Sequence, residues 1–113
     1  MKVQRAKNPS AQGNARHTEC FINNQLTIGF VDSGADETLV RQSTAKQLEL
    51  PVTKKQRPIT GYGNVQSGTT VGTADIDLKI GSYSTKHKVW IVPDELQEED
   101  IIIGFDIIGK PDI

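Results

Sequence analysis

The triplet Asp32-Ser33-Gly34 is the segment whose residue types and order could do chemistry. It directly follows the apolar run 29–31, and an acid at the end of a buried strand is costly to bury as a charge. Gly34 lets the backbone approach another segment closely, and Ser33 supplies a hydroxyl that can hydrogen-bond to a partner. Two carboxylates a few ångströms apart share one proton, so one can activate water while the other hydrogen-bonds a substrate carbonyl.

The chain carries this triplet only once. Asp94, Asp100 and Asp106 are each followed by a residue other than Ser or Thr, and residues 67–68 form a Ser-Gly pair without the acid. If Asp32 works in a pair, its partner must come from a second copy of the chain across a two-fold axis. This chemistry therefore requires an obligate homodimer. Asp106 is interpreted as a residue at the N-terminus of a helix rather than as a catalytic acid.

Short apolar runs separated by turn signals must position the triplet. Residues 20–23 and 26–31 flank Asn23-Asn24, which is a hairpin signal, and the second run leads straight into the triplet. Residues 39–40 are expected to form a further strand. Residues 44–50 have about one turn of helical character before a proline ends it.

The second half of the chain also shows β patterns. Residues 58–71 form a hairpin signal around a Gly-Asn pair, and residues 73–80 alternate strictly between apolar and polar side chains. Residues 86–92 return after a Gly-Ser turn, and the three isoleucines 101–103 are typical of a strand buried on both faces. Residues 105–108 are expected to form a short helix. About eight short strands and at most two short helices predict an all-β domain with a barrel-like closed fold.

Other reactive side chains give weaker signals. His17, Cys20 and His87 lack the spacing of metal ligands. The position of Cys20 in a predicted strand favours a place in the core over a role as a thiol nucleophile. Trp90 is expected at a surface edge or between lobes, and the acidic residues 94–100 are expected to form a solvated loop.

Composition limits the possible classes of function. The chain has 113 residues, enough for one domain, and a net charge of −1, which gives no reason to expect nucleic acid as the main partner. No apolar run approaches the roughly 20 residues of a membrane span, and no secretory signal is visible. A single cysteine excludes an intramolecular disulfide. Residues 1–16, basic and without acids, are expected to be a flexible N-terminal leader, with a polyprotein junction or a basic arm as alternatives.

Two segments resemble signatures of a known family. Residues 32–38 (DSGADET), placed after an apolar strand, closely resemble the active-site loop of the retropepsins, the aspartic proteases of retroviral type. Residues 101–108 (IIIGFDII) resemble the second signature of that family, an apolar triplet and a glycine followed by a short helix. The stretch TAKQLELPV is similar to its counterpart in retrotransposon proteases, and a Gly-rich hairpin lies midway between the two signatures. The resemblance covers roughly residues 17–110, and residues 17–113 are expected to form the protease domain.

The resemblance implies a fold, an activity and a set of site residues. The fold would be a retropepsin-like closed barrel with one short C-terminal helix and an active site at the two-fold axis of a homodimer. The activity would be that of an aspartic endopeptidase that cleaves extended segments of the polyprotein of a retrovirus or LTR retrotransposon, in the cytoplasm or within virus-like particles. No cofactor, metal, membrane or nucleic acid would take part. The implied positions are Asp32 (catalytic), Ser33 and Gly34 (active-site loop, with the Ser33 hydroxyl bonded across the dimer axis), Ala35, Asp36 and Glu37 (substrate binding), and Gly61, Tyr62, Gly63 and Asn64 (the flap, a mobile hairpin over the substrate).

Two departures from the family pattern concern the site and the dimer. In many retroviral proteases an arginine follows the glycine of the second signature and braces the acid that matches Asp36, whereas this chain has Phe105. Either another arginine braces Asp36, or Asp36 points to solvent. Viral relatives also continue after the helix into a strand that interleaves with the partner, whereas this sequence ends at Ile113. Weak dimerisation is one expected consequence, and a chain cut from a longer polyprotein is the alternative.

Two further functions stay open beside viral polyprotein processing. The first is a retropepsin-like domain of a cellular protein, such as the DNA-damage-inducible type. The second is an inactive copy that serves as a dimerisation or peptide-binding module.

Overall fold

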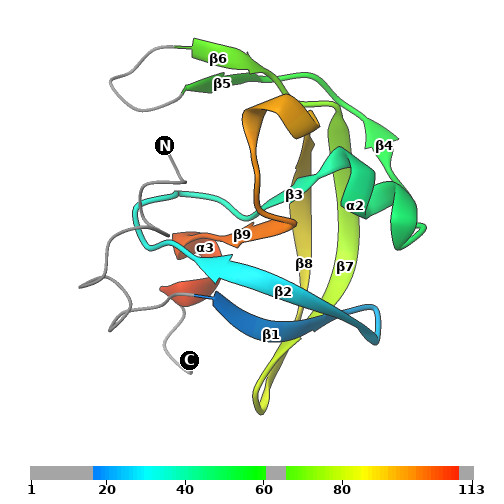
Figure 1. The fold of residues 1–113 in the computed structure, drawn as a ribbon, viewed down its shortest axis with the longest axis vertical. Coiled ribbons are helices and arrows are strands. Elements are labelled where there is room, and N and C mark those ends of the chain that lie inside the picture. Colours follow the sequence, from blue (N-terminus) through cyan, green and yellow to red (C-terminus); the bar gives the residue numbers. More distant parts are fainter. Residues whose placement is uncertain (1–16, 61–65, 110–113) are drawn as a thin grey trace.

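The computed structural model describes residues 17–60 and 66–109, which contain nine strands, two α-helices and one 3₁₀ helix (Figure 1). No helix among them is long and apolar enough to cross a membrane. In chain order the elements are β1 (His17–Ile22), β2 (Gln25–Val31), β3 (Leu39–Arg41), α2 (Gln42–Gln47), β4 (Thr53–Lys54), β5 (Pro58–Thr60), β6 (Gln66–Thr69), β7 (Gly72–Ile80), β8 (Tyr83–Val92), the 3₁₀ helix η3 (Asp94–Leu96), β9 (Ile101–Ile103) and α3 (Phe105–Ile108).

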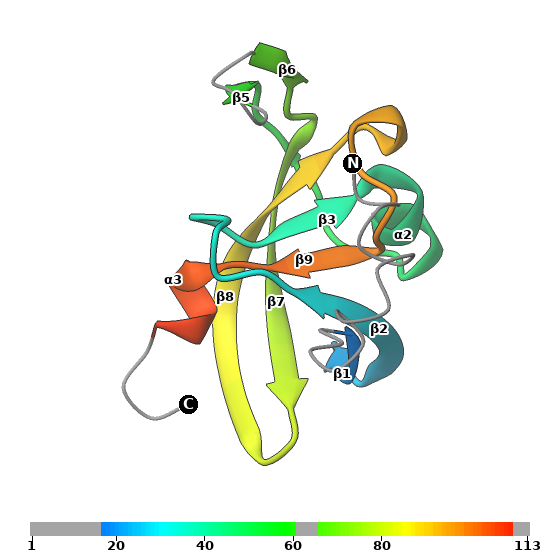
Figure 2. The ribbon, with the colours of Figure 1, turned by 60° about the vertical axis from the view of Figure 1, so that its left-hand side comes forward.

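Six strands close into a barrel. Their order is β1-β2-β9-β3-β8-β7, and the ring closes where β1 pairs with β7. β4 pairs with the first two residues of β7, while β5 and β6 form a separate hairpin that extends beyond the barrel (Figures 1 and 2). The predicted all-β closed barrel with a short C-terminal helix is confirmed. The sequence did not predict its two parallel pairs, β2 with β9 and β3 with β8.

The turn between β1 and β2 helps to close the barrel. Asn23 and Asn24 have φ values of 50° and 68°, as the two central residues of a type I′ turn require. The Asn23 amide donates to the Asp77 carbonyl at 2.8 Å, and the Asn23 side-chain oxygen accepts from the Asp77 amide at 2.8 Å. The predicted hairpin is confirmed, and its turn fixes β1 against β7.

Strand β7 shows the alternation that its sequence predicts. Ala74, Ile76 and Leu78 are buried, while Asp75 and Asp77 are exposed. Its partner β8 begins three residues before the predicted 86, because residues 83–85 carry no continuous apolar run to mark a strand in the sequence. Pairing along all of β7 extends β8 nonetheless.

The core lies inside the barrel and is mostly aliphatic. Strand β9 lies in the barrel wall between β2 and β3, with Ile101 and Ile103 fully buried and Ile102 only half-buried. The expectation that this strand is buried on both faces was therefore wrong for its outer face. The buried apolar side chains are Cys20, Ile22, Phe30, Val40, Ala45, Leu50, Ala74, Ile76, Leu78, Val89, Ile91, Val92, Ile101, Ile103 and Ile107.

The acidic segment after β8 is solvated at Asp94, Glu95 and Glu98, as its sequence suggested, and two of its acids also brace the fold. Asp94 lies at η3 and accepts a hydrogen bond from the Ser43 amide at 2.9 Å, which holds the pKa of Asp94 below its usual range. Asp100 accepts hydrogen bonds from the Thr44 hydroxyl at 2.8 Å and from Arg41 at 3.2 Å. These contacts tie the first turn of α2 to the segment that precedes β9.

Cys20 belongs to the core, as its strand position indicated. Its side chain is fully buried, and burial raises the pKa of the thiol to about 11. At pH 8 only about one thiol in a thousand is then ionised, and thiolate is the reactive form. We expect iodoacetamide to label the folded protein at least about a hundredfold more slowly than the protein in urea. Mass spectrometry measures both rates, and equal rates would contradict the buried position.

Candidate active site

Asp32 stands where β2 ends, at the start of a loop that runs to β3. Its amide donates to the Ile103 carbonyl at 3.0 Å, so the main chain is fixed to β9 at this point. One carboxylate oxygen accepts a hydrogen bond from the Gly34 amide at 2.9 Å. The side chain is half-buried, so the carboxylate has a fixed orientation and still reaches the surface. A Cβ atom on Gly34 would lie 3.3 Å from the same oxygen, so any larger residue here would require a small shift of the Asp32 carboxylate.

Residues 104–106, in the second signature, hold this loop by backbone hydrogen bonds and close packing. The Phe105 amide donates to the Ala35 carbonyl at 2.7 Å, and the Asp106 amide donates to the Asp36 carbonyl at 3.2 Å. A Cβ atom on Gly104 would lie only 2.5 Å from the Glu37 carbonyl oxygen. Glycine is therefore required here by close packing of the two backbones. The sequence indicated each signature separately, and the fold places one against the other.

Asp106 anchors the end of the loop through its side chain. The carboxylate accepts from the Thr38 amide at 3.0 Å and from the Thr38 hydroxyl at 2.7 Å, and it lies 2.9 Å from Nε2 of His87 on β8. The Thr38 hydroxyl, fully buried, also accepts from the Gly104 amide at 3.1 Å. Asp106 does lie in the first turn of α3, as predicted. Its larger role as an anchor was missed, because the pairing of Asp106 with Thr38 spans 68 residues and has no local signal.

The acids of the loop have different environments. Asp36 is exposed, so of the two alternatives for this residue the structure gives the solvent-facing one. The available arginine, Arg57, forms an ion pair with Glu37 instead. Phe105, at the position where many retroviral proteases have arginine, is 58% exposed. Ser33 and Gly34 are exposed as well, which leaves the tip of the loop accessible to another molecule.

Residues 18–110 match the sequence profile of the family described as gag-polyprotein putative aspartyl protease. The chain belongs to this family. The resemblance to retropepsins on residues 32–38 and 101–108 is thus confirmed across almost the whole domain. A comparison with curated protein sequences finds no match.

Solved retropepsin structures have the same fold as this aspartyl protease family member. The retroviral protease-like domain of Ddi1 from Leishmania major matches with a TM-score of 0.64 and 24% identity, covering 84% of this chain and 76% of that one. The EIAV protease, solved in complex with the inhibitor HBY-793, matches with a TM-score of 0.64 and 21% identity, covering 84% of this chain and 86% of that one. At these identities the likeness shows the fold alone.

The predicted flap residues 61–64 of this aspartyl protease family member lie outside the described residues. The base of their hairpin is described: Pro58 pairs with Thr69, and Ile59 with Gly68. Figure 2 shows this hairpin projecting from the barrel on the side where the loop between β2 and β3 lies. The roles of residues 61–64 stay predictions.

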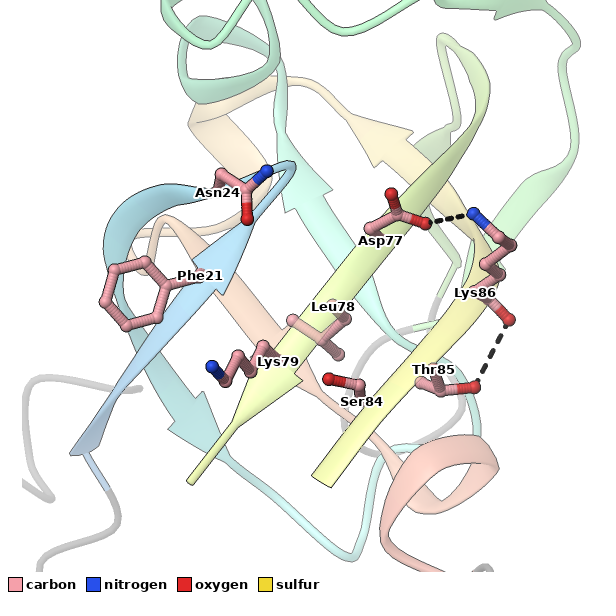
Figure 3. Close-up of a pocket in the computed structure, with 8 residues that line it drawn as sticks. All are labelled: Phe21, Asn24, Asp77, Leu78, Lys79, Ser84, Thr85 and Lys86. Atoms are coloured by element: carbon pink, nitrogen blue, oxygen red, sulfur yellow. Dashed lines mark hydrogen bonds and ion pairs between the residues drawn. The ribbon is translucent and has the colours of Figure 1, made fainter. Parts of the chain in front are cut away.

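A surface pocket elsewhere on the barrel has no link to the loop. It lies between the turn after β1 and the β7–β8 hairpin, with Phe21, Lys79 and Ser84 among its lining residues (Figure 3). None of the residues that line it belongs to the segment 32–38. Within the described part of the chain, no three His, Cys, Asp or Glu side chains gather as a metal site would require.

Proposed function

We propose that this chain is an aspartic endopeptidase that processes the polyprotein of a retrovirus or LTR retrotransposon. The observation that carries the proposal is the state of Asp32, a half-buried carboxylate oriented by the Gly34 amide. Its loop is held to β9 and α3 by backbone hydrogen bonds. Catalytic side chains need this combination of access and fixed geometry. The match to gag-polyprotein aspartyl proteases supports the choice of substrate. With such a substrate, we propose that the protein acts in the cytoplasm or within virus-like particles.

The chemistry needs Asp32 and the same residue of a second copy. Two carboxylates a few ångströms apart cannot both ionise, so the pair holds a single proton. The ionised member takes a proton from water, and the water oxygen forms a bond to the scissile carbonyl carbon. The protonated member hydrogen-bonds the carbonyl oxygen and stabilises the charge that develops there. The carboxyl group that took the proton from water then gives it to the leaving nitrogen, and the C–N bond breaks without a covalent enzyme intermediate.

The homodimer follows from the single triplet in the sequence. Ser33 and Gly34 are exposed beside Asp32, so the surface that a second copy would cover lies next to the carboxylate. Residues 35–37 continue from this point and are proposed to hold the extended substrate, as an added strand, by their backbone and side chains.

Cleavage measured over a concentration series tests the shared site. We expect the rate per chain to rise between nanomolar and micromolar protein, because only the associated form holds two carboxylates. A fluorogenic gag-derived peptide gives the rate at each concentration. Two copies joined by a flexible linker serve as the matched control, and their rate per chain should stay constant under dilution. A constant rate for the single-copy chain across this range would contradict the shared site.

A second candidate is a retropepsin-like domain with a cellular substrate. The Leishmania Ddi1 domain favours it, because that domain and the EIAV protease match this chain with the same TM-score of 0.64. Both candidates use the same carboxylate pair and differ in substrate, so cleavage of gag-derived but not cellular substrates favours the viral one. An inactive dimerisation module would bind a hydroxyl-bearing transition-state analogue weakly and cleave neither.

A further inference from the structure

Arg57 has a main chain that is fixed at the base of the β5–β6 hairpin. It directly precedes β5, and its amide donates to the Thr70 hydroxyl at 2.9 Å. The Thr70 amide in turn donates to the Arg57 carbonyl at 2.9 Å. Thr70 is 2% exposed, and its hydroxyl also donates to the Lys55 carbonyl at 2.8 Å. The point from which the Arg57 side chain leaves the backbone is therefore rigid.

The Arg57 side chain reaches across to the active-site loop. Its Nη1 donates to Oε2 of Glu37 at 3.3 Å, and its Nη2 pairs with Oε1 of the same carboxylate. Such a two-point contact fixes the relative orientation of the two groups, which a single ammonium could not do. The guanidinium carbon also lies 4.1 Å from the centre of the Trp90 ring, within cation–π range.

The contacts among Arg57, Glu37, Thr38 and Trp90 form a closed ring, the Arg57 circuit. Trp90 lies on β8, and its amide donates to the Thr38 carbonyl at 3.2 Å, next to Glu37 in the loop. Both Glu37 and Trp90 therefore fix the position of the Arg57 side chain, while Thr70 fixes its backbone. We propose that Arg57 is a positioning residue that couples the base of the β5–β6 hairpin to the active-site loop. As a statement about cleavage, this rests on the proposed function.

The coupling acts on substrate binding more than on the chemical step. Asp32 is oriented by Gly34 and Ile103, and neither contact involves Arg57. Loss of the Arg57 side chain would instead let the base of the β5–β6 hairpin move relative to residues 35–37. The substrate would lie between the hairpin and these residues. We expect KM to rise while kcat changes little.

Fluorescence tests the circuit without any cleavage, because Trp90 is the only tryptophan in the chain. Arg57→Ala should change the emission of Trp90, and Glu37→Gln should cause the same kind of change, because without the carboxylate the guanidinium leaves the ring. Lys55→Ala is the matched control: its ammonium lies 5.8 Å from the same ring, and no contact joins it to Glu37. The control should change the emission less than Arg57→Ala does, because 5.8 Å is close to the outer limit of a cation–π contact. Unaltered emission in Glu37→Gln would overturn the proposal, because Arg57 would then stack on Trp90 independently of the loop.

Kinetics tests the consequence for cleavage. We expect kcat/KM to fall about tenfold in Arg57→Ala, with most of the change in KM, since the variant loses both the half-exposed ion pair with Glu37 and the stacking contact with Trp90. Arg57→Lys should restore only part of the loss, and Lys55→Ala should cleave at the normal rate. A loss confined to kcat, or complete rescue by lysine, would overturn the positioning role. If Arg57→Ala is unfolded by circular dichroism, the emission of Glu37→Gln and the kinetics of Arg57→Lys carry the two tests. If the unchanged chain cleaves nothing, the proposed function fails, and the fluorescence series still decides the circuit.

Discussion

Asparagine in place of Asp32 should abolish peptide cleavage and leave the fold intact. The amide cannot ionise, so a dimer of this variant lacks both the general base and the shared proton. We expect the rate to fall at least about a thousandfold. The asparagine oxygen can still accept the Gly34 hydrogen bond, and the Asp32 backbone bond to Ile103 is untouched. Circular dichroism and thermal melting should therefore match those of the unchanged chain.

An exposed acid on another strand of the barrel provides the control for this variant. Asp75 lies on the outer face of β7, where its side chain is 78% exposed and pairs with Lys88 at 3.2 Å. Asp75→Asn removes one carboxylate in the same way, and it should cleave at the normal rate. Asp32→Asn chains added in excess to unchanged chains should also suppress cleavage, because mixed dimers hold one carboxylate. Substantial turnover by Asp32→Asn alone would refute the assignment of the catalytic acid.

The sequence predicted those features that depend on neighbouring residues. The alternation along β7 appears directly in the burial of Ala74 and Ile76 and the exposure of Asp75, because a strand with one face in the core imposes a period of two. The Asn23-Asn24 turn was predictable for a similar reason, since two consecutive residues with positive φ need side chains that tolerate that conformation.

Contacts between distant segments could not be predicted in this way. The sequence shows acids at 94 and 100 and an arginine at 57, but their partners depend on the packing of η3, α2 and the β5–β6 hairpin against the barrel. Charge patterning therefore indicated the solvated side of this segment, with Asp94, Glu95 and Glu98 exposed, but not the contacts by which Asp94 and Asp100 brace the fold. The parallel pairing of β2 with β9 has the same origin, because it brings together residues about 70 positions apart, Gly29 and Ile101 among them.

Replacement of Asp106 by alanine should destabilise the protein more than the same change at an exposed acid. The change leaves three groups without their acceptor: the Thr38 amide, the fully buried Thr38 hydroxyl and the His87 ring. Unpaired buried polar groups cost about 1 to 3 kcal/mol each, and partial access of water lowers the sum here, so we expect a loss of about 3 kcal/mol. That corresponds to a melting temperature lower by about 10 °C, measured by calorimetry.

Asparagine at position 106 separates the hydrogen bonds from the charge. One amide oxygen can still accept from the Thr38 backbone, but the NH₂ group must replace the oxygen that accepts from the Thr38 hydroxyl, so we expect a loss of about 1 kcal/mol. Asp77→Ala is the control for a general loss of carboxylate, since its side chain is 61% exposed and pairs with the exposed Lys86. It should shift melting by less than about 2 °C. If Asp106→Ala melted like Asp77→Ala, Asp106 would not anchor the loop, and the geometry of Asp32 would have to depend on Gly34, Ile103 and the remaining backbone contacts alone.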